Sequence, residues 1–454
     1  MTLRLALRAL ASRPVRTGVL ACGFGFGIAV MAALLGVGEV ILEQARSPAL
    51  QGGGDVLVTG ASGPLGSARL IAGSVLMTPP LSGRVTVASP ARYARLYLVR
   101  PEGVVALQAR GGVPSLERKL GDAETEGVAG WSDAPGDAAW SSPDPGDVLR
   151  AMDRFHAIPE APAYAASWAE WLYFNGVSGD TRFYLTFLFG PGDEHGNRRA
   201  GLRLQLDRGG KITSFSEAGS VPGESLLAEA PDVAIGKSRV RLEGQRYRIT
   251  LALPGLEGEL TLDAVPGRSM APAAIRGTGG WVSGYVVPVL SGKLGGMLRI
   301  GNEVLPLDGT GYHDHNWGFW KDVSWQWGQV AGDGLSIVYG RVRPPPDVAD
   351  PARVPGFLAV LGPDGPIGFS TRVTIEETDD PRAGTPRRIV VDARGESLEL
   401  RMELDVTNAV RTPWSRADLE ALSLVQMRAA YRVEGRVAGR AVSFSAAGSA
   451  ETFR

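Results

Sequence analysis

The part of the sequence richest in chemically active side chains is the run from Gly311 to Trp320, Gly-Tyr-His-Asp-His-Asn-Trp-Gly-Phe-Trp. It contains two of the chain's four histidines, a carboxyl group, an amide and two indoles. Large aromatic side chains with polar tips are costly to bury unless those tips find hydrogen-bond partners. We therefore expect this run either to form a functional site or to close the fold with a hydrogen-bonded cluster.

A β-strand over residues 312–317 would separate these side chains into two groups, because successive residues of a strand point to opposite faces. The groups would be His313, His315 and Trp317 on one face, and Tyr312, Asp314 and Asn316 on the other. A glycine on each side of the strand permits the close approach or bulge that is common near active sites.

Two more aromatic runs flank the central one, Trp168-Ala-Glu-Trp-Leu-Tyr-Phe-Asn upstream and Trp325-x-Trp327 downstream. Together with Gly-Tyr-His-Asp-His-Asn-Trp-Gly, they resemble the carotenoid 1,2-hydratase (hydroxyneurosporene synthase) family, which includes the AttH-like proteins. The resemblance covers roughly residues 160–454 and implies two tandem lipocalin-like β-barrels. The family's usual double tryptophan is Trp171-Leu172 here. The particular reaction therefore does not follow from the resemblance.

The activity that this resemblance implies is the addition of water to an isoprenoid double bond. A carboxyl group in an apolar pocket has a raised pKa and holds a proton near neutral pH, and aromatic faces attract a carbocation. We expect Asp314 to donate the proton, with His313 or His315 placing the water or orienting the carboxyl group. The predicted catalytic residues are Asp314, His313, His315 and Tyr312. The predicted ligand-binding residues are Glu170, Trp171, Tyr173, Asn316, Trp317, Trp325 and Trp327.

Other roles for these residues stay open. Buried polar groups must be satisfied, so the histidine–aspartate run could instead close one end of a barrel. A zinc site on His313 and His315 would need a third ligand such as His195, Glu170 or His156, and we predict neither a metal nor another cofactor. Glu170 could equally pair with an arginine from another strand, and Glu451 could anchor the last strand by hydrogen bonds.

Charge and cysteine content exclude several classes of protein. The 454 residues contain 47 Lys+Arg and 48 Asp+Glu, so the net charge is −1. No basic patch points to nucleic acid, and nothing suggests electrostatic capture of a charged polymer. The single cysteine, Cys22, allows neither a disulfide framework nor a thiolate metal site.

The N-terminus predicts a membrane anchor. An uncharged run at residues 17–38 follows Arg4, Arg8, Arg13 and Arg16. Its length is close to the ~20 residues that cross a bilayer, and arginine before the span predicts a cytoplasmic N-terminus with an extracytoplasmic body. We thus expect a single-pass protein of the cytoplasmic membrane; a cleaved signal peptide is the alternative. Residues 3–46 also resemble the first helix of a MacB/FtsX-type ABC-transporter permease, which implies permease and ATPase partners.

The rest of the chain reads as mainly β. Phe183, Leu185, Phe187 and Phe189 alternate with polar residues, and later segments repeat this period of two, which is typical of antiparallel sheets or barrels. We predict an N-terminal signal-anchor transmembrane helix at 1–46 and a membrane-proximal β-rich segment with a linker at 47–150. The first barrel would span 151–343 and the second 344–454, separated at Pro344-Pro345-Pro346.

Two functions follow from these observations. The first is a membrane-anchored enzyme that binds an apolar isoprenoid or lipid and hydrates, cyclises or isomerises a C=C bond. The second is a non-catalytic lipid-binding accessory protein of an AttH-type ABC exporter. A purely structural extracytoplasmic module is a third reading, and it would have a solid interior.

Overall fold

The computed structural model describes residues 54–59, 68–77, 83–101, 103–121, 125, 128–141, 143–228, 231–265, 267–413 and 423–454, with isolated positions between 12 and 31. The chain divides into two compact units. One comprises residues 1–61 and 91–135, and the other comprises residues 62–90 and 136–454. Most of the predicted anchor at 1–46 lies outside the described residues. Within the described part of the chain, no helix has both the length and the apolar character needed to cross a membrane.

Among its described residues, the first unit contains one antiparallel hairpin. Its strands are β1 (Ala91–Arg100) and β2 (Gly103–Gly112), paired along their whole length, and they are followed by α4 (Pro114–Leu120). Proline at the start of α4 and the left-handed Gly121 at its end are ordinary helix boundaries. This hairpin lies within the segment 47–150 that was predicted to be β-rich.

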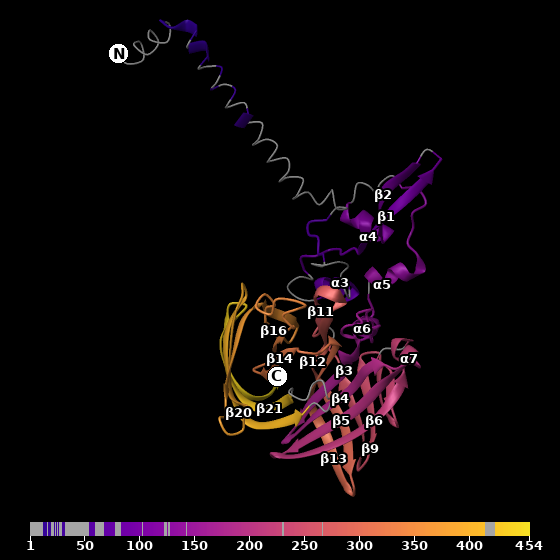
Figure 1. The fold of residues 1–454 in the computed structure, drawn as a ribbon, viewed down its shortest axis with the longest axis vertical. Helices are drawn as coiled ribbons and strands as arrows, with labels where there is room; N and C mark the ends of the chain where they lie inside the picture. The colour runs from indigo at the N-terminus through magenta and orange to yellow at the C-terminus, as the bar shows by residue number, and fades with distance from the viewer. Residues whose placement is uncertain are drawn as a thin grey trace. The chain divides into compact units, whose positions relative to one another are not determined.

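The larger unit begins with short helices that lead into the sheets (Figure 1). They are α3 (Ala68–Met77), η3 (Pro135–Asp137), α5 (Ala138–Ser141), α6 (Pro145–Met152) and η4 (Ala165–Ser167); α7 (Gly223–Ala228) and η5 (Thr278–Gly280) follow later. The side chain of Asp144 caps α6 by accepting a hydrogen bond from the Asp147 backbone N–H at 3.0 Å.

The first sheet has eleven antiparallel strands and curls into a nearly closed barrel, in which the edge strands β6 and β7 approach each other. The order is β6-β5-β4-β3-β13-β12-β10-β9-β8-β7, with β11 paired to β12. The bounds are β3 Trp168–Ser178, β4 Thr181–Gly192, β5 Asn197–Arg208, β6 Lys211–Pro222, β7 Val233–Ile235, β8 Ser238–Glu243, β9 Arg246–Leu253, β10 Leu256–Asp263, β11 Met270–Arg276, β12 Val282–Ile300 and β13 Glu303–Phe319.

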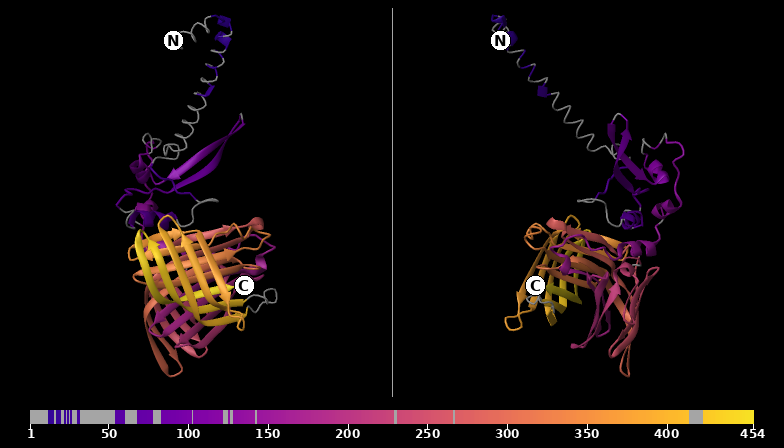
Figure 2. Two further views of the ribbon diagram at one scale, coloured as in Figure 1. Left: turned by 90° about the vertical axis from the view of Figure 1, so that its left-hand side faces the viewer. Right: turned by 45° about the vertical axis from the view of Figure 1, so that its right-hand side comes forward.

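The second sheet has nine antiparallel strands and forms a half-barrel beside the first (Figure 2). The order is β17-β16-β15-β14-β22-β21-β20-β19-β18. The bounds are β14 Ser324–Gly332, β15 Leu335–Arg343, β16 Phe357–Gly362, β17 Gly365–Ser370, β18 Arg372–Asp379, β19 Pro386–Arg394, β20 Leu398–Pro413, β21 Ser423–Val437 and β22 Arg440–Phe453. The edge strands β17 and β18 do not hydrogen bond to each other, so the second predicted barrel is not closed.

The boundary between the sheets differs from the predicted one. Strands β14 and β15 were assigned to the first barrel because the proline triplet at 344–346 looks like a linker. They belong to the second sheet instead, because β14 pairs with β22 and β15 pairs with β16. The chain crosses between sheets in the short turn from Trp320 to Val323. A connection this short has no distinctive amino-acid composition, so the sequence does not reveal it as a boundary. The prolines lie instead in a longer loop between two strands of the second sheet.

The predicted alternation accounts for the core. In β4, the side chains of Phe183, Leu185, Phe187 and Phe189 are all buried in the first core. In β20, Leu398, Leu400, Met402 and Leu404 do the same in the second. Side chains alternate between the two faces of each strand, and one face is apolar. Each sheet therefore surrounds its own apolar core. A third apolar cluster, which includes Tyr173, Tyr312 and Trp327, lies where the two sheets meet.

Candidate active site

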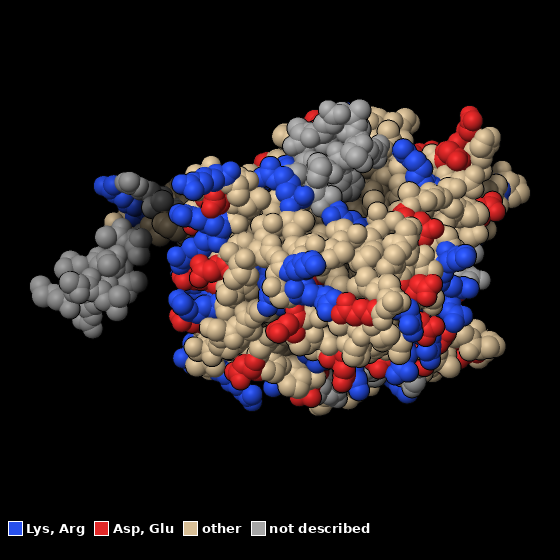
Figure 3. All heavy atoms as spheres, turned by 90° about the horizontal axis from the view of Figure 1, so that it is seen from below, with Lys and Arg blue, Asp and Glu red and all other residues tan. Residues whose placement is uncertain are grey.

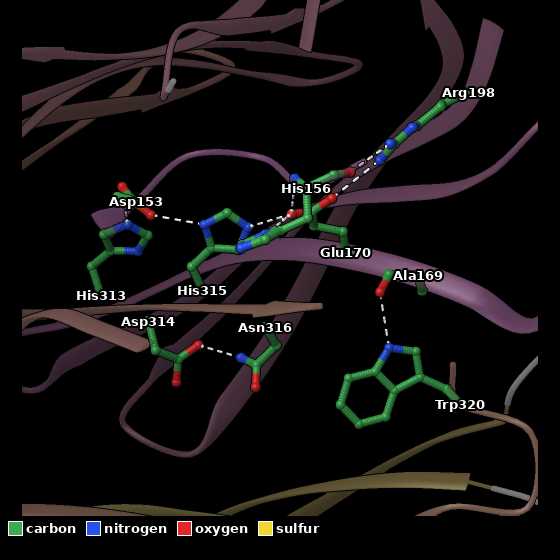
Figure 4. A network of polar contacts seen from close by, with 10 residues as sticks. All are labelled: Asp153, His156, Ala169, Glu170, Arg198, His313, Asp314, His315, Asn316 and Trp320. Carbon is green, nitrogen blue, oxygen red and sulfur yellow. Dashed lines mark hydrogen bonds and ion pairs between the residues drawn. The ribbon is translucent and has the colours of Figure 1, made fainter. Parts of the chain in front are cut away.

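The central run lies on β13, in the middle of the first sheet between β3 and β12. Asp314 is opposite Tyr173 of β3, and Trp317 is opposite Glu170. Figure 4 shows His313 and His315 on one side of the strand and Asp314 and Asn316 on the other. The predicted alternation of faces is therefore present, and the two faces have different surroundings.

On the inner face, Asp153 joins both histidines. Its carboxylate lies 3.0 Å from His313 Nε2 and 2.9 Å from His315 Nδ1. The hydroxyl of Tyr247 donates a third hydrogen bond to it at 2.8 Å. Asp153, His313 and His315 are completely buried. Asp153 directly follows α6, and this position places its carboxylate inside the barrel.

Glu170 is the second hub of the same network. Its Oε1 lies 3.1 Å from His315 Nε2 and 2.8 Å from His156 Nδ1. Its Oε2 accepts a hydrogen bond from Arg198 Nη1 at 3.1 Å, and Arg198 Nη2 also donates to the His156 carbonyl at 2.7 Å. The expectation that Glu170 pairs with an arginine from another strand is met by Arg198 of β5.

The network is arranged around a positively charged His315. Burial alone would lower the pKa of this imidazole, but its hydrogen bonds to Asp153 and Glu170 raise the pKa to about 9. Burial would likewise raise the pKa of Asp153, but the charges and hydrogen bonds of His313 and His315 lower it to about 2. Burial lowers the pKa of His156, although the hydrogen bond to Glu170 acts in the opposite direction and raises it. The positive charges of His315 and Arg198 thus balance the negative charges of Asp153 and Glu170 within the buried network.

This inner face forms a hydrogen-bonded plug in the first barrel. Each ring nitrogen of His313 and His315 has a partner within the protein. Trp317 stacks on His156 with ring centroids 3.9 Å apart. His313, His315 and Trp317 do not line the cavity described below. These side chains therefore belong to the buried network of the first barrel and not to the wall of the cavity.

The zinc hypothesis can be examined at the same place. One donor atom each from His156, Glu170 and His315 lie within 4.8 Å of one another, which is a possible metal-binding spacing. Glu170 Oε1 already joins the other two residues, and the guanidinium of Arg198 lies on the same carboxylate. That positive charge favours the hydrogen-bonded arrangement over a bound cation. His195 is in an exposed loop, where its nearest ion-pair partner is Glu194 at 3.6 Å.

On the outer face, Asp314 is held by its two neighbours along the strand. Tyr312 donates its hydroxyl hydrogen to Oδ2 at 2.8 Å, and the Asn316 amide donates to Oδ1 at 2.8 Å. The Tyr312 hydroxyl lies 2.7 Å from that of Tyr285, to which the Trp327 indole N–H donates at 3.1 Å. A line of hydrogen bonds thus runs from the second sheet to the carboxyl group.

Asp314 lines a large cavity between the two sheets, with a volume of about 1230 Å³. This exceeds the ~300–1,000 Å³ typical of pockets for drug-sized ligands. Walls come from β3, β4, β5, β6, β11, β12 and β13 of the first sheet, from β14, β15, β16, β17, β21 and β22 of the second, and from α3. The lining is mostly apolar, and its aromatic members include Trp171, Tyr173, Tyr285, Trp320, Trp325, Trp327, Phe357 and Phe369.

Three indoles form one continuous patch of this wall. The ring centroids of Trp320 lie 4.7 Å from Trp171 and 5.3 Å from Trp325, and Trp171 and Trp325 are 5.9 Å apart. Phe453 stacks behind Trp325 at 4.1 Å, and the Trp320 N–H donates to the Ala169 carbonyl at 2.9 Å (Figure 4). These contacts hold the rings together as one aromatic surface in the wall that Asp314 also lines.

The surroundings of Asp314 favour its neutral form. Burial raises the pKa of this carboxyl group well above its usual range, and the hydrogen bond from Tyr312 only partly opposes that effect. The negative charge of Glu451 adds to the rise. No ion pair to Asp314 is formed within the part of the chain that the structure describes. These surroundings therefore favour the protonated carboxylic acid over the carboxylate.

Glu451 is a cavity residue that the sequence did not reveal. It was expected to anchor the last strand, yet its side chain lines the cavity from β22. Burial raises its pKa to about 7, against a hydrogen bond from Gln426 Nε2 at 3.0 Å. The motif lies more than a hundred residues away, and only the pairing of β22 with β14 brings the two together. No local pattern around residue 451 signals this.

The structure thus divides the predicted site. Six predicted residues line the cavity, namely Trp171, Tyr173, Asp314, Asn316, Trp325 and Trp327. Tyr312 supports Asp314 from beside it. Four lie in the plug instead, namely Glu170, His313, His315 and Trp317. The sequence could not assign the faces to a cavity or a core, because both carry polar and aromatic side chains.

Charge outside the cavity is mixed. On the face shown in Figure 3, basic and acidic side chains are interspersed, without a large area of one sign. This agrees with the near-zero net charge of the chain.

No family model matches the chain, and no curated protein matches it. Among solved structures, an AttH protein of Nitrosomonas europaea is 16% identical, with 65% of this chain and 97% of that one covered and a TM-score of 0.45. CghA in complex with Sch210972 is 12% identical over 66% and 94% of the two chains, with a TM-score of 0.46. Kievitone hydratase from Nectria haematococca is 14% identical over 66% and 93%, with a TM-score of 0.44.

Proposed function

We propose that the chain binds an apolar, unsaturated molecule in the cavity between its sheets and protonates a C=C bond of that molecule from Asp314. The observation that carries this proposal is a buried carboxyl group, held by Tyr312 and Asn316, in the wall of an aromatic cavity. Addition of water to the resulting cation gives hydration, as the resemblance to carotenoid hydratases implies. Loss of a proton or attack by a second double bond would give isomerisation or cyclisation.

The residues around Asp314 fit the needs of that step. Protonation of an alkene carbon creates a carbocation, which the faces of Trp171, Trp320 and Trp325 would stabilise. Tyr312 and Asn316 each donate a hydrogen bond to the carboxyl group, and these bonds stabilise the carboxylate left after the proton departs. The same two bonds hold the carboxyl group in one orientation.

A second function is favoured by the size and apolar lining of the cavity. A non-catalytic carrier would hold a lipid there and deliver it to an exporter, and it would need no acid chemistry. The membrane anchor and the ABC-transporter partners belong to this proposal as predictions. They rest on residues 1–46, most of which lie outside the described part of the chain.

The test begins with the full chain purified in mild detergent. Bound molecules are extracted, identified by mass spectrometry and returned to the protein in H₂¹⁸O. We expect the wild type to incorporate ¹⁸O into the molecule and Asp314→Asn to abolish incorporation. Asp308→Asn, an exposed change on the same strand, should leave incorporation unchanged. Binding without conversion by the wild type would favour the carrier, and full activity of Asp314→Asn would remove Asp314 from the reaction.

A further inference from the structure

The wall that the second sheet contributes to the cavity also carries a carboxyl group. Glu451 projects from β22 of the second sheet, whereas Asp314 projects from β13 of the first, and both line the same space. In the strand register, Glu451 is opposite Trp327 of β14 and Gln426 of β21. Cross-strand neighbours share a face, so all three side chains are presented to the cavity together. The lining includes each of them.

We propose that Glu451 is a catalytic proton acceptor, which takes a proton from the water that attacks the cation formed next to Asp314. This inference rests on the proposed function. It assigns a general acid to one sheet and a general base to the other, with the substrate between them. An apolar substrate with a double bond near the indole patch would meet the acid on one side and the base with its water on the other.

Each bond change in this step is accounted for. The O–H bond of Asp314 breaks, and its proton forms a C–H bond with the π electrons of the alkene. A lone pair of water forms a C–O bond to the adjacent cationic carbon. One O–H bond of that water then breaks, and its proton passes to the carboxylate of Glu451. Exchange with solvent returns a proton to Asp314 and removes one from Glu451, so the net change is addition of water.

The two carboxyl groups are suited to different roles by their surroundings. Burial raises both pKa values, but Glu451 reaches only about 7, so much of it is ionised at neutral pH. Burial raises the pKa of Asp314 well above its usual range, which favours its protonated form, and Tyr312 and Asn316 hold its two oxygens. Different surroundings of two carboxyl groups in one site suit them to different roles as acid and base. Within the described residues, Glu451 forms no ion pair that would hold it permanently ionised.

The groups that face Glu451 come from several strands of the first sheet. They are Tyr173 of β3, Tyr184 of β4, Tyr285 of β12 and Asp314 of β13. Burial raises the pKa of each of these groups, which favours its neutral form. The titration of Glu451 near neutral pH therefore depends on burial, which raises its pKa, and on the side chains of Gln426 and Tyr173, which lower it.

The experiment separates proton delivery from water attack. The full chain in mild detergent is given farnesol, geranylgeraniol or squalene, once in D₂O and once in H₂¹⁸O. We expect Asp314→Asn to lose both isotopes. Glu451→Gln should still exchange deuterium into the alkene but incorporate ¹⁸O at least ~100-fold more slowly, which is the usual size of a general-base contribution. Incorporation of ¹⁸O by Glu451→Gln within about threefold of the wild type would overturn the role of Glu451 while leaving that of Asp314 intact. A wild type that takes up neither isotope would overturn both.

A second readout does not depend on turnover. Infrared difference spectra taken from about pH 6 to pH 8 should show a carboxyl group losing its proton, and this signal should vanish in Glu451→Gln. Gln426→Leu should move the signal to higher pH, because the hydrogen bond that favours the ionised form is lost. If the signal persists in Glu451→Gln, or if it is unmoved in Gln426→Leu, the assignment is wrong.

Discussion

Replacement of His315 by phenylalanine tests the plug in the first barrel. The imidazolium has a folded pKa of about 9 against an ordinary 6.5. At about 1.4 kcal/mol per pKa unit, this difference corresponds to about 3 kcal/mol of stability. The folded pKa is the higher one, so this contribution is fully present below pH 6.5 and is lost as the pH rises through 9. Removing the cation also leaves Asp153 and Glu170 without their shared partner, and a broken buried ion pair costs roughly 3–5 kcal/mol.

The assay is urea-induced unfolding of the full chain in mild detergent, followed by tryptophan fluorescence at several pH values. We expect His315→Phe to lower the midpoint strongly at pH 6. The wild type should lose stability between about pH 6.5 and 9 through this group, and the variant should lack that decline. His195→Phe is the matched control, because His195 is exposed on a loop. A change of less than ~1 kcal/mol at pH 6, or an unchanged decline toward pH 9, would refute the argument.

Two further predictions concern the same unfolding assay. Gly284→Ala should lower stability by about 1–3 kcal/mol, because the added methyl group would lie 2.1 Å from the buried indole of Trp317, whereas Gly111→Ala has open space and should be nearly neutral. Equal effects of the two changes would contradict this packing. Glu451→Gln should stabilise the protein at pH 8 by up to about 3 kcal/mol, since the folded pKa of about 7 exceeds the ordinary 4.5 and the ionised form is the disfavoured one. The gain should disappear near pH 4, and a loss of stability at pH 8 would show that the carboxylate is favourably held.

Much of the fold could be predicted from local patterns. Alternation in β4 and β20 identifies the strands and their buried faces, because one side chain in two points inward. The same patterns cannot tell which strands pair across the chain. Strands β14 and β15 join the second sheet only because β22, the last strand, completes it. Nor can they show that the second sheet stays open, which depends on the unpaired edges β17 and β18.

The sequence predicted the two groups of side chains at the candidate site, but it did not predict which group faces a cavity. The run at 312–317 separates into two groups by strand geometry, and the structure confirms that separation. Which group faces a cavity depends on partners that are remote in sequence. Asp153 and Arg198 complete the plug on one side, while Glu451 and the indoles complete the cavity on the other. Asp153 follows a short helix and has no motif around it, so its pairing with two histidines arises only from the folded chain.

The account rests on an apolar molecule occupying the space between the two sheets, and filling that space tests it most directly. Ala273 of β11 is exposed, lines the cavity and pairs with Tyr285, so a tryptophan there would project beside the Tyr285 ring. Ala441→Trp, an exposed change near the start of β22, is the matched control. The measurement is the amount of bound molecule recovered by extraction and mass spectrometry from equal amounts of each protein. We predict that the wild type and Ala441→Trp carry the same molecule and that Ala273→Trp loses it; equal recovery from all three would contradict binding between the sheets.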